Sequence, residues 1–124
     1  MLTILLVGVG GAIGSIARFL LSATVQRRSR SSFPWGTVVV NGTGSFLIGV
    51  AFALFDGGVY SGDALVFLAS GILGGYTTFS TFSVENMALL EQRRYGWLLA
   101  NTVGQISAAL LFAVLGYWLG SAAV

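Results

Sequence analysis

Residues 71–83 read Gly71-Ile72-Leu73-Gly74-Gly75-Tyr76-Thr77-Thr78-Phe79-Ser80-Thr81-Phe82-Ser83 and lie inside a long apolar stretch. Glycine and threonine both lower helix propensity, so two glycines followed soon by two threonines make a poor helical turn. We predict a break in the helix here, and its exposed backbone carbonyls would need protein, water or a cation as partners. A bent but unbroken helix, whose threonine hydroxyls bond to the preceding turn, is the open alternative.

Working outward, the broken segment is one of four apolar stretches long enough to cross a membrane, which takes about 20 residues. They cover approximately residues 2–23, 38–55, 65–90 and 97–120. Of the 124 residues, 56% are hydrophobic and 8% are charged, whereas soluble domains carry about a quarter of charged residues. We therefore predict an all-α membrane protein, with four transmembrane helices forming a single domain over residues 1–124.

Composition also bears on chemistry. The chain has no histidine and no cysteine, so it lacks the usual general base, thiol chemistry and soft-metal ligands. We expect a protein that is not an enzyme and binds no nucleic acid. No basic residue precedes Arg18, so we interpret the first stretch as a permanent helix and not as a cleaved signal peptide. A multi-pass protein of the cell (inner or plasma) membrane is expected.

Polar side chains inside the spans are informative because an unsatisfied polar group in hydrocarbon costs several kcal/mol. Phe79 and Phe82 are three residues apart and share a helix face, and Asn101 and Gln105, four apart, share another. Further neutral donors are Asn41, Ser80, Thr81 and Ser83. Such donors beside aromatic edges, which carry partial positive charge, suit a small, strongly hydrated anion. Ordinary packing for the phenylalanines and interhelical bonding for the amides are the alternatives.

The glycines predict close helix packing. The chain has 18 of them, and small residues let helix backbones approach closely in lipid. Those on the first two spans include Gly10, Gly11, Gly14, Gly42, Gly44 and Gly49. Because four helices enclose little space, we also expect the chain to form an oligomer.

Four segments together resemble the Fluc fluoride channels, also called the CrcB family, in order and spacing. They read GGAIGSIAR at 10–18, GTVVVN at 36–41, GSFLIG at 44–49 and GILGGYTTFSTFS at 71–83. The resemblance spans all four helices and is most specific in the last segment. It implies a fluoride-specific channel that exports fluoride passively and limits its toxicity in the cytoplasm. It also implies an antiparallel, dual-topology dimer with two fluoride pathways.

The resemblance further implies roles for individual residues. The edges of Phe79 and Phe82 would face fluoride, and Asn41 would supply an amide to the pathway. The hydroxyl track would comprise Ser80, Thr81 and Ser83, while Gln105 and Asn101 stand where members carry polar groups on the fourth helix. A structural sodium ion at the dimer centre would be bound by carbonyls of Gly74 and Thr77 from both subunits. Arg18 would lie near an aqueous vestibule.

Charge in the connections bears on the dimer. The first and third connections, on one side of the membrane, carry Arg27, Arg28, Arg30, Arg93 and Arg94. The positive-inside rule places this side in the cytoplasm, whereas an antiparallel homodimer needs both orientations. A heterodimer with an oppositely oriented paralogue is therefore a second hypothesis beside the simpler homodimer.

A different function class is the small proton-coupled multidrug exporter, which is also a dimer of four-helix subunits. Its mechanism needs a carboxylate embedded in the membrane. Glu85, toward the end of the third span, is the only candidate. A noncatalytic assembly protein would leave the polar residues of 71–83 unexplained.

Overall fold

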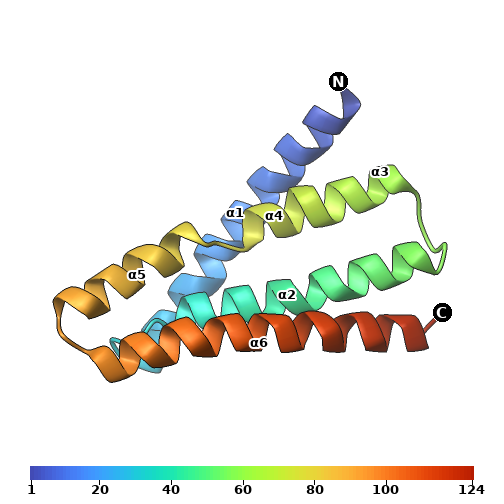
Figure 1. Ribbon diagram of the computed structural model, residues 1–124. Coiled ribbons are helices and arrows are strands. Elements are labelled where there is room, and N and C mark those ends of the chain that lie inside the picture. Colours follow the sequence, from blue (N-terminus) through green and yellow to red (C-terminus); the bar gives the residue numbers. More distant parts are fainter.

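The computed structural model describes all 124 residues and consists of helices and their connections (Figure 1). The elements are α1 (Leu2–Ser29), α2 (Trp35–Asp56), α3 (Gly62–Leu65), the π-helix η1 (Val66–Leu73), α4 (Gly74–Tyr76), α5 (Ser80–Glu91) and α6 (Tyr95–Ala122). Together α3 to α5 form the third span, Gly62–Glu91, so the four predicted membrane-spanning segments are confirmed.

Each helix extends beyond its predicted limits, and α1 does so most. It continues past the apolar residues to Ser29 and includes Arg27 and Arg28 in its last turn. Basic side chains are favourable there, because the carbonyl end of a helix carries partial negative charge. Hydrophobicity alone therefore marks the membrane-buried part of the helix and misses its polar continuation.

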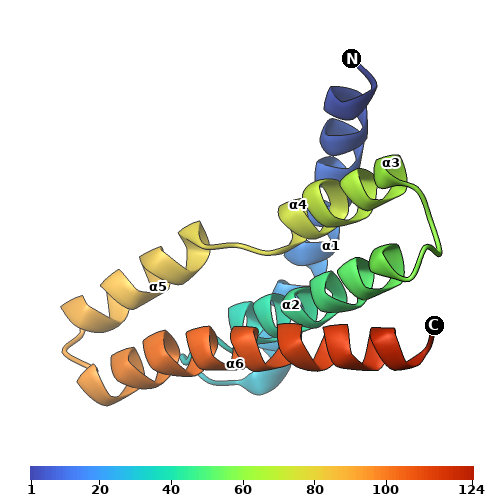
Figure 2. The same cartoon turned by 45° about the vertical axis from the view of Figure 1, so that its right-hand side comes forward.

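The third span is broken, as the glycine and threonine residues predict. α4 ends at Tyr76 and α5 begins at Ser80, and Figure 2 shows the intervening segment as extended chain between two separated helices. Thr77 has extended backbone angles (φ −80°, ψ 155°). The N–H of Thr78 donates to the side chain of Asn41 instead of the carbonyl four residues earlier, so an external partner replaces the lost helical bond.

Glycines let two helix pairs pack backbone against backbone. α2 lies beside α6, running in the same direction (Figure 1), and a Cβ atom on Gly49 or Gly116 would collide with a carbonyl of the facing helix. α1 packs against the third span in the same way, where a Cβ on Gly14 would meet the carbonyl of Ile72. The predicted close packing is thus confirmed at Gly14 and Gly49.

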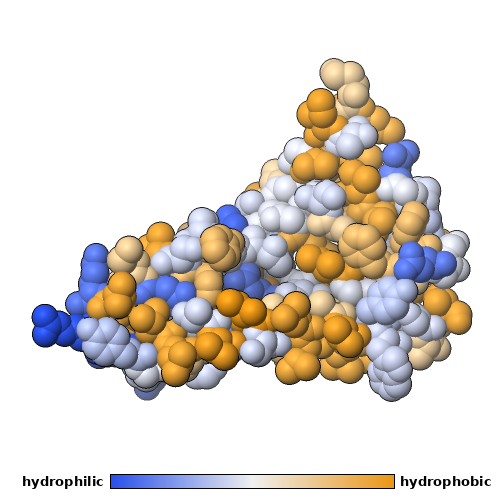
Figure 3. Space-filling model, in the orientation of Figure 1, coloured by the Kyte–Doolittle hydropathy of each residue, from blue (hydrophilic) through white to orange (hydrophobic).

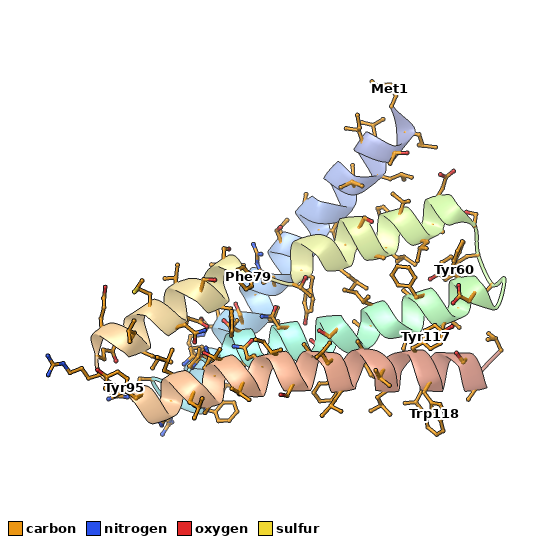
Figure 4. The ribbon with its side chains drawn as sticks, in the orientation of Figure 1. Met1, Tyr60, Phe79, Tyr95, Tyr117 and Trp118 are labelled. Carbon is orange, nitrogen blue, oxygen red and sulfur yellow. The ribbon has the colours of Figure 1, made fainter.

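Aromatic and charged side chains mark the two ends of the molecule. At one end, Arg94 donates to the hydroxyl of Ser32 at 2.9 Å and lies 4.5 Å from the ring centroid of Trp97. This contact joins the first and third connections, which were predicted to lie on the same side of the membrane. Figure 4 shows Tyr95 at this end of α6, and Tyr60, Tyr117 and Trp118 toward the other. Aromatic rings at both ends match the two headgroup layers of a bilayer.

The surface of the single chain is strongly apolar. Only 21 of 124 residues are buried, and apolar side chains cover much of the face in Figure 3. The first half of α1 projects beyond the other helices (Figure 1), with Ile4 71% exposed. A surface of this kind requires lipid or a second protein chain to cover it.

Candidate functional site

A cavity of about 260 Å³ lies beside the break in the third span. Its lining combines residues of α2, the break, α5 and α6: Asn41, Ser45, Ile48, Thr77, Thr78, Phe79, Phe82, Gln105, Ile106 and Ala109. None of these residues is charged, and most of the polar ones carry a hydroxyl or an amide. The structure therefore brings together Asn41, Phe79, Phe82 and Gln105, which come from three different spans.

The two phenylalanines form a ring pair at the start of α5. Their centroids lie 5.8 Å apart with the planes inclined by 40°. Phe82 is 8% exposed, whereas Phe79 is 78% exposed, and Figure 4 shows Phe79 where the chain leaves the break. The ring of Phe82 is thus packed inside the protein, whereas the ring of Phe79 lies on the surface of the single chain.

Asn41 holds the break against α2. Its Oδ1 accepts the backbone N–H of Thr78 at 2.8 Å, and its Nδ2 donates to the carbonyl of Thr78 at 2.9 Å. The same Nδ2 donates to Oε1 of Gln105 at 3.1 Å. Both amide hydrogens of Asn41 are therefore engaged within the chain, as the alternative of interhelical bonding for the amides predicted.

Thr78 was not among the predicted site residues, yet it organises the hydroxyl groups. Its Oγ1 accepts the N–H of Thr81 at 3.2 Å and lies 3.3 Å from Oγ of Ser80, in the manner of a side chain that caps a helix. Ser83 donates instead to the carbonyl of Phe79 at 3.0 Å. Three of the four hydroxyls thus cluster at the start of α5, while Ser83 is bonded to its own helix.

Arg18 lies on a second hollow, of about 300 Å³, on the other side of Thr78. Arg18 is half-buried, and it is the only charged residue in a lining that includes Thr37, Thr78 and Thr81. Because Thr78 lines both this hollow and the cavity beside the phenylalanines, it stands between a charged space and a neutral one.

Glu85 lies on a neighbouring hollow of about 270 Å³ that also contains Thr37 and Thr81. The hydroxyl of Thr37 donates to Oε1 of Glu85 at 2.6 Å, and Oε2 is buried without a partner. The sequence suggested Glu85 only as an exporter carboxylate and did not indicate Thr37. The one feature of the sequence that could have indicated Thr37 is that it is a polar residue at the start of the second span.

The break leaves backbone carbonyls without their usual helical donors, among them those of Gly74 and Thr77. The N–H of Thr78, which would bond to the Gly74 carbonyl, donates to Asn41. The N–H of Thr81, which would bond to the Thr77 carbonyl, donates to the side chain of Thr78. Uncharged oxygen atoms of this kind suit a hard cation, and the chain has no cluster of acidic, histidine or cysteine side chains that could hold one.

Comparison with known proteins places this geometry in a family. Residues 5–117 match the family described as CrcB-like protein, Camphor Resistance (CrcB). The chain belongs to the CrcB family. Three relatives each named fluoride-specific ion channel FluC are similar over nearly their full length. The relative from Thermus thermophilus is 49% identical over 97% of this chain and 94% of its own. The relative from Rhizobium meliloti is 46% identical over 91% of this chain and 91% of its own. The relative from Phocaeicola vulgatus is 38% identical over 96% of this chain and 98% of its own.

The four segments that carry the CrcB resemblance converge in space. Segment 10–18 supplies Arg18 to the charged hollow. Segment 36–41 supplies Thr37 to the charged hollow and Asn41 to the neutral cavity. Segment 44–49 supplies Ser45 and Ile48 to the neutral cavity, and segment 71–83 supplies the break and the phenylalanines. Membership of the CrcB family leaves the proton-coupled multidrug exporter without support.

Proposed function

We propose that this CrcB protein is a subunit of a fluoride-specific channel in the cell (inner or plasma) membrane, which lets fluoride leave the cytoplasm passively and so limits its toxicity. The observation that carries the proposal is the neutral cavity at the break, where a ring pair lies beside amides and hydroxyls. The fluoride-channel names of relatives up to 49% identical support the choice of ion.

The chemistry of the cavity suits a small anion. Fluoride holds its water strongly, so a pathway must replace that water with hydrogen-bond donors and electropositive edges. A fixed positive charge in the cavity would hold the ion too tightly for rapid transfer, because conduction requires binding that is favourable and yet weak. In the proposed pathway, Phe79 and Phe82 present ring edges and the amides of Asn41 and Gln105 line the cavity. Asn41 donates to fluoride when one of its amide hydrogens turns from the Thr78 carbonyl or from Gln105.

The route into the cavity begins at the charged hollow. Arg18 attracts the anion into a vestibule, and the hydroxyls of Thr81 and Ser80 around Thr78 lead from there toward the phenylalanines. Ser83 joins this track when its hydroxyl turns from the Phe79 carbonyl. The positive charge thus stays at the entrance, where it raises the local anion concentration without retaining the ion inside.

The functional unit in this proposal is an antiparallel, dual-topology homodimer. Phe79 is 78% exposed and the first half of α1 is largely uncovered, so a second copy would both cover apolar surface and complete the pathway. The five arginines at one end favour one orientation under the positive-inside rule. A heterodimer with an oppositely oriented paralogue is the alternative, and a conducting channel from this chain expressed alone would eliminate the obligate form.

A structural sodium ion at the dimer centre belongs to the same proposal. The carbonyls of Gly74 and Thr77, freed by the break, would supply ligands from both subunits. Such an ion would hold two broken helices together, because it replaces lost backbone bonds with coordination. Replacing sodium by a large organic cation during reconstitution is expected to reduce the fraction of conducting dimers.

Fluoride efflux tests the central proposal. Purified protein is reconstituted in liposomes loaded with either potassium fluoride or potassium chloride, and the released anion is followed with an ion-selective electrode. We expect rapid fluoride release that depends on protein, with chloride release at the rate of empty liposomes. Equal release of both anions would contradict fluoride selectivity, and absence of release from the chain alone would favour the heterodimer or refute the channel.

A further inference from the structure

Four amide side chains form a hydrogen-bonded chain across three helices. Asn41 on α2 donates to Gln105 on α6 at 3.1 Å, and Gln105 donates to Asn101 at 2.7 Å. Asn101 then donates to Oδ1 of Asn86 on α5 at 2.7 Å. We call these four residues the amide chain. It starts at the break in the third span and returns to α5 farther along the same span.

The direction of the amide chain is fixed from one end. The backbone N–H of Thr78 can only donate and its carbonyl can only accept, so their bonds to Asn41 determine which way that amide faces. The remaining hydrogen of Asn41 then points to Oε1 of Gln105, which leaves the nitrogen of Gln105 for Asn101. Each amide thus orients the next, and a change at Gln105 disturbs both directions of the chain.

The α6 members of the amide chain are held by protein groups. Asn101 is 0% exposed and Gln105 is 7% exposed, and Asn101 does not line the cavity at the phenylalanines. Buried amides are favourable in an apolar environment only when they are bonded, since an unpartnered polar group costs free energy there. Asn101 therefore contacts α5 and Gln105 without contacting the cavity that would hold an anion.

The helix that receives this chain has little other attachment. The only buried residues of α5 are Phe82 and Leu89, and in Figures 1 and 2 it lies along the first part of α6, apart from α3 and α4. Side-chain hydrogen bonds join α5 to other helices through Asn86 and Glu85. Just before α5 begins, Thr78 is also bonded to Asn41. The position of α5 consequently depends on hydrogen bonds more than on apolar burial.

We propose that Gln105 and Asn101 are positioning residues, which orient Asn41 and hold α5 so that Phe79 and Phe82 stand at the cavity. The proposal deepens the proposed channel function: it adds a role through protein contacts for both α6 amides, of which Gln105 also lines the cavity and Asn101 does not. The placement of α5 is a property that can be measured without ion flux, so the two proposals can fail separately.

The absence of cysteine allows a specific probe of α5. Met87 is 56% exposed on this helix, and Met87→Cys would carry the only thiol in the chain for a nitroxide spin label. In reconstituted protein, Gln105→Met removes both bonds of residue 105 and is expected to increase label mobility. One interhelical hydrogen bond in a membrane shifts an equilibrium by about three- to twentyfold. We expect Gln105→Met to lower the ratio of ordered to displaced α5 by a factor within that range. Thr102→Val on the same helix is the matched control and should leave mobility unchanged.

Gln105→Glu tests the same role within a single folded sample. A protonated glutamic acid can accept from Asn41 and donate to Asn101, whereas the ionised form can only accept. Label mobility is therefore expected to return to the wild-type value as the pH is lowered, and Gln105→Met should show no such recovery. This readout stays informative if Gln105→Met fails to fold.

Flux measured on the same labelled proteins completes the test. Reduced fluoride efflux together with a more mobile label in Gln105→Met supports positioning. Reduced efflux with unchanged label mobility would overturn it, because Gln105 would then act directly on the ion. Mobility that is unchanged in both Gln105 variants at every pH would overturn it as well. Absence of efflux from the labelled wild-type sequence would count against the proposed channel and not against the placement of α5.

Discussion

The hydroxyl of Thr37 donates a 2.6 Å hydrogen bond to Glu85, whose second carboxylate oxygen is buried without a partner. This bond joins the start of α2 to α5 and is the only one that satisfies the carboxyl group within the chain. Thr37→Val should therefore destabilise the attachment of α5 by about 1–3 kcal/mol, the usual cost of leaving a buried acceptor unpaired.

Monodispersity on size-exclusion chromatography after graded heating measures this effect. Thr37→Ser keeps the hydroxyl and is expected to behave like the wild type. Equal losses in the valine and serine variants would show that the methyl group of Thr37, and not its hydrogen bond, matters.

The ring pair predicts a separation of conduction from assembly. Phe82→Ile removes the aromatic edge while keeping an apolar side chain, so fluoride efflux should fall by at least about tenfold, the effect of 1.4 kcal/mol on a rate. The proposed dimer should persist on size-exclusion chromatography. Phe52→Ile is the matched control, because Phe52 is 44% exposed on α2 and lies outside the cavity lining. A Phe82 variant that conducts normally would remove the ring edge from the mechanism.

Backbone contact between α1 and the third span predicts sensitivity at Gly14. A Cβ there would collide with the Ile72 carbonyl and come within 2.8 Å of the Tyr76 nitrogen. Neither group is the end of a flexible side chain, so Gly14→Ala should destabilise the fold by about 1–3 kcal/mol, as overpacking does. The yield of monodisperse protein after heating reports the loss. Gly8→Ala adds its methyl group where no atom lies within 4 Å and should be neutral.

Tyr60 predicts a loss of stability in alkaline solution. Its hydroxyl donates to the Ala51 carbonyl, and removal from water raises the pKa of Tyr60 above its usual value near 10. The folded protein therefore favours the protonated phenol. The resulting stability is fully present below about pH 10 and is lost as the pH rises through the folded-state pKa. Thermal melts above pH 10 should show a smaller decline for Tyr60→Phe than for the wild type, and parallel declines would exclude this contribution.

Hydrophobicity was sufficient to predict the four spans, whereas local propensity favoured the break and left a bent, unbroken helix open. The apolar stretches are long and strongly marked, and the glycine–threonine run has low helix propensity. Helix limits were less predictable, because α1 continues through Arg27 and Arg28 after the apolar signal has ended. The polar extension is stabilised by helix-end electrostatics, which a search for membrane spans does not detect.

The side-chain partners could be predicted only in part. Spacing placed Asn101 and Gln105 on one helix face, and the structure confirms a bond between them. The spacing did not indicate that the side chain of Asn41 would bond to the backbone of Thr78, nor that Asn86 would accept a hydrogen bond from Asn101. Those contacts join residues 37 and 15 positions apart in different helices. Single-sequence periodicity carries no information about which faces meet, so they required the three-dimensional arrangement.

The π-helix η1 lies before the break and is separated from it only by the short helix α4. A π-helical turn holds one residue more than an α-helical turn, so Val66–Leu73 contains slack that an α-helix would lack. Deleting a single residue there would let the segment rewind as an α-helix and turn everything before it relative to Gly74. The extra residue of the π-helix thus sets which side chains of the first part of the third span face α1, independently of the geometry of the break downstream.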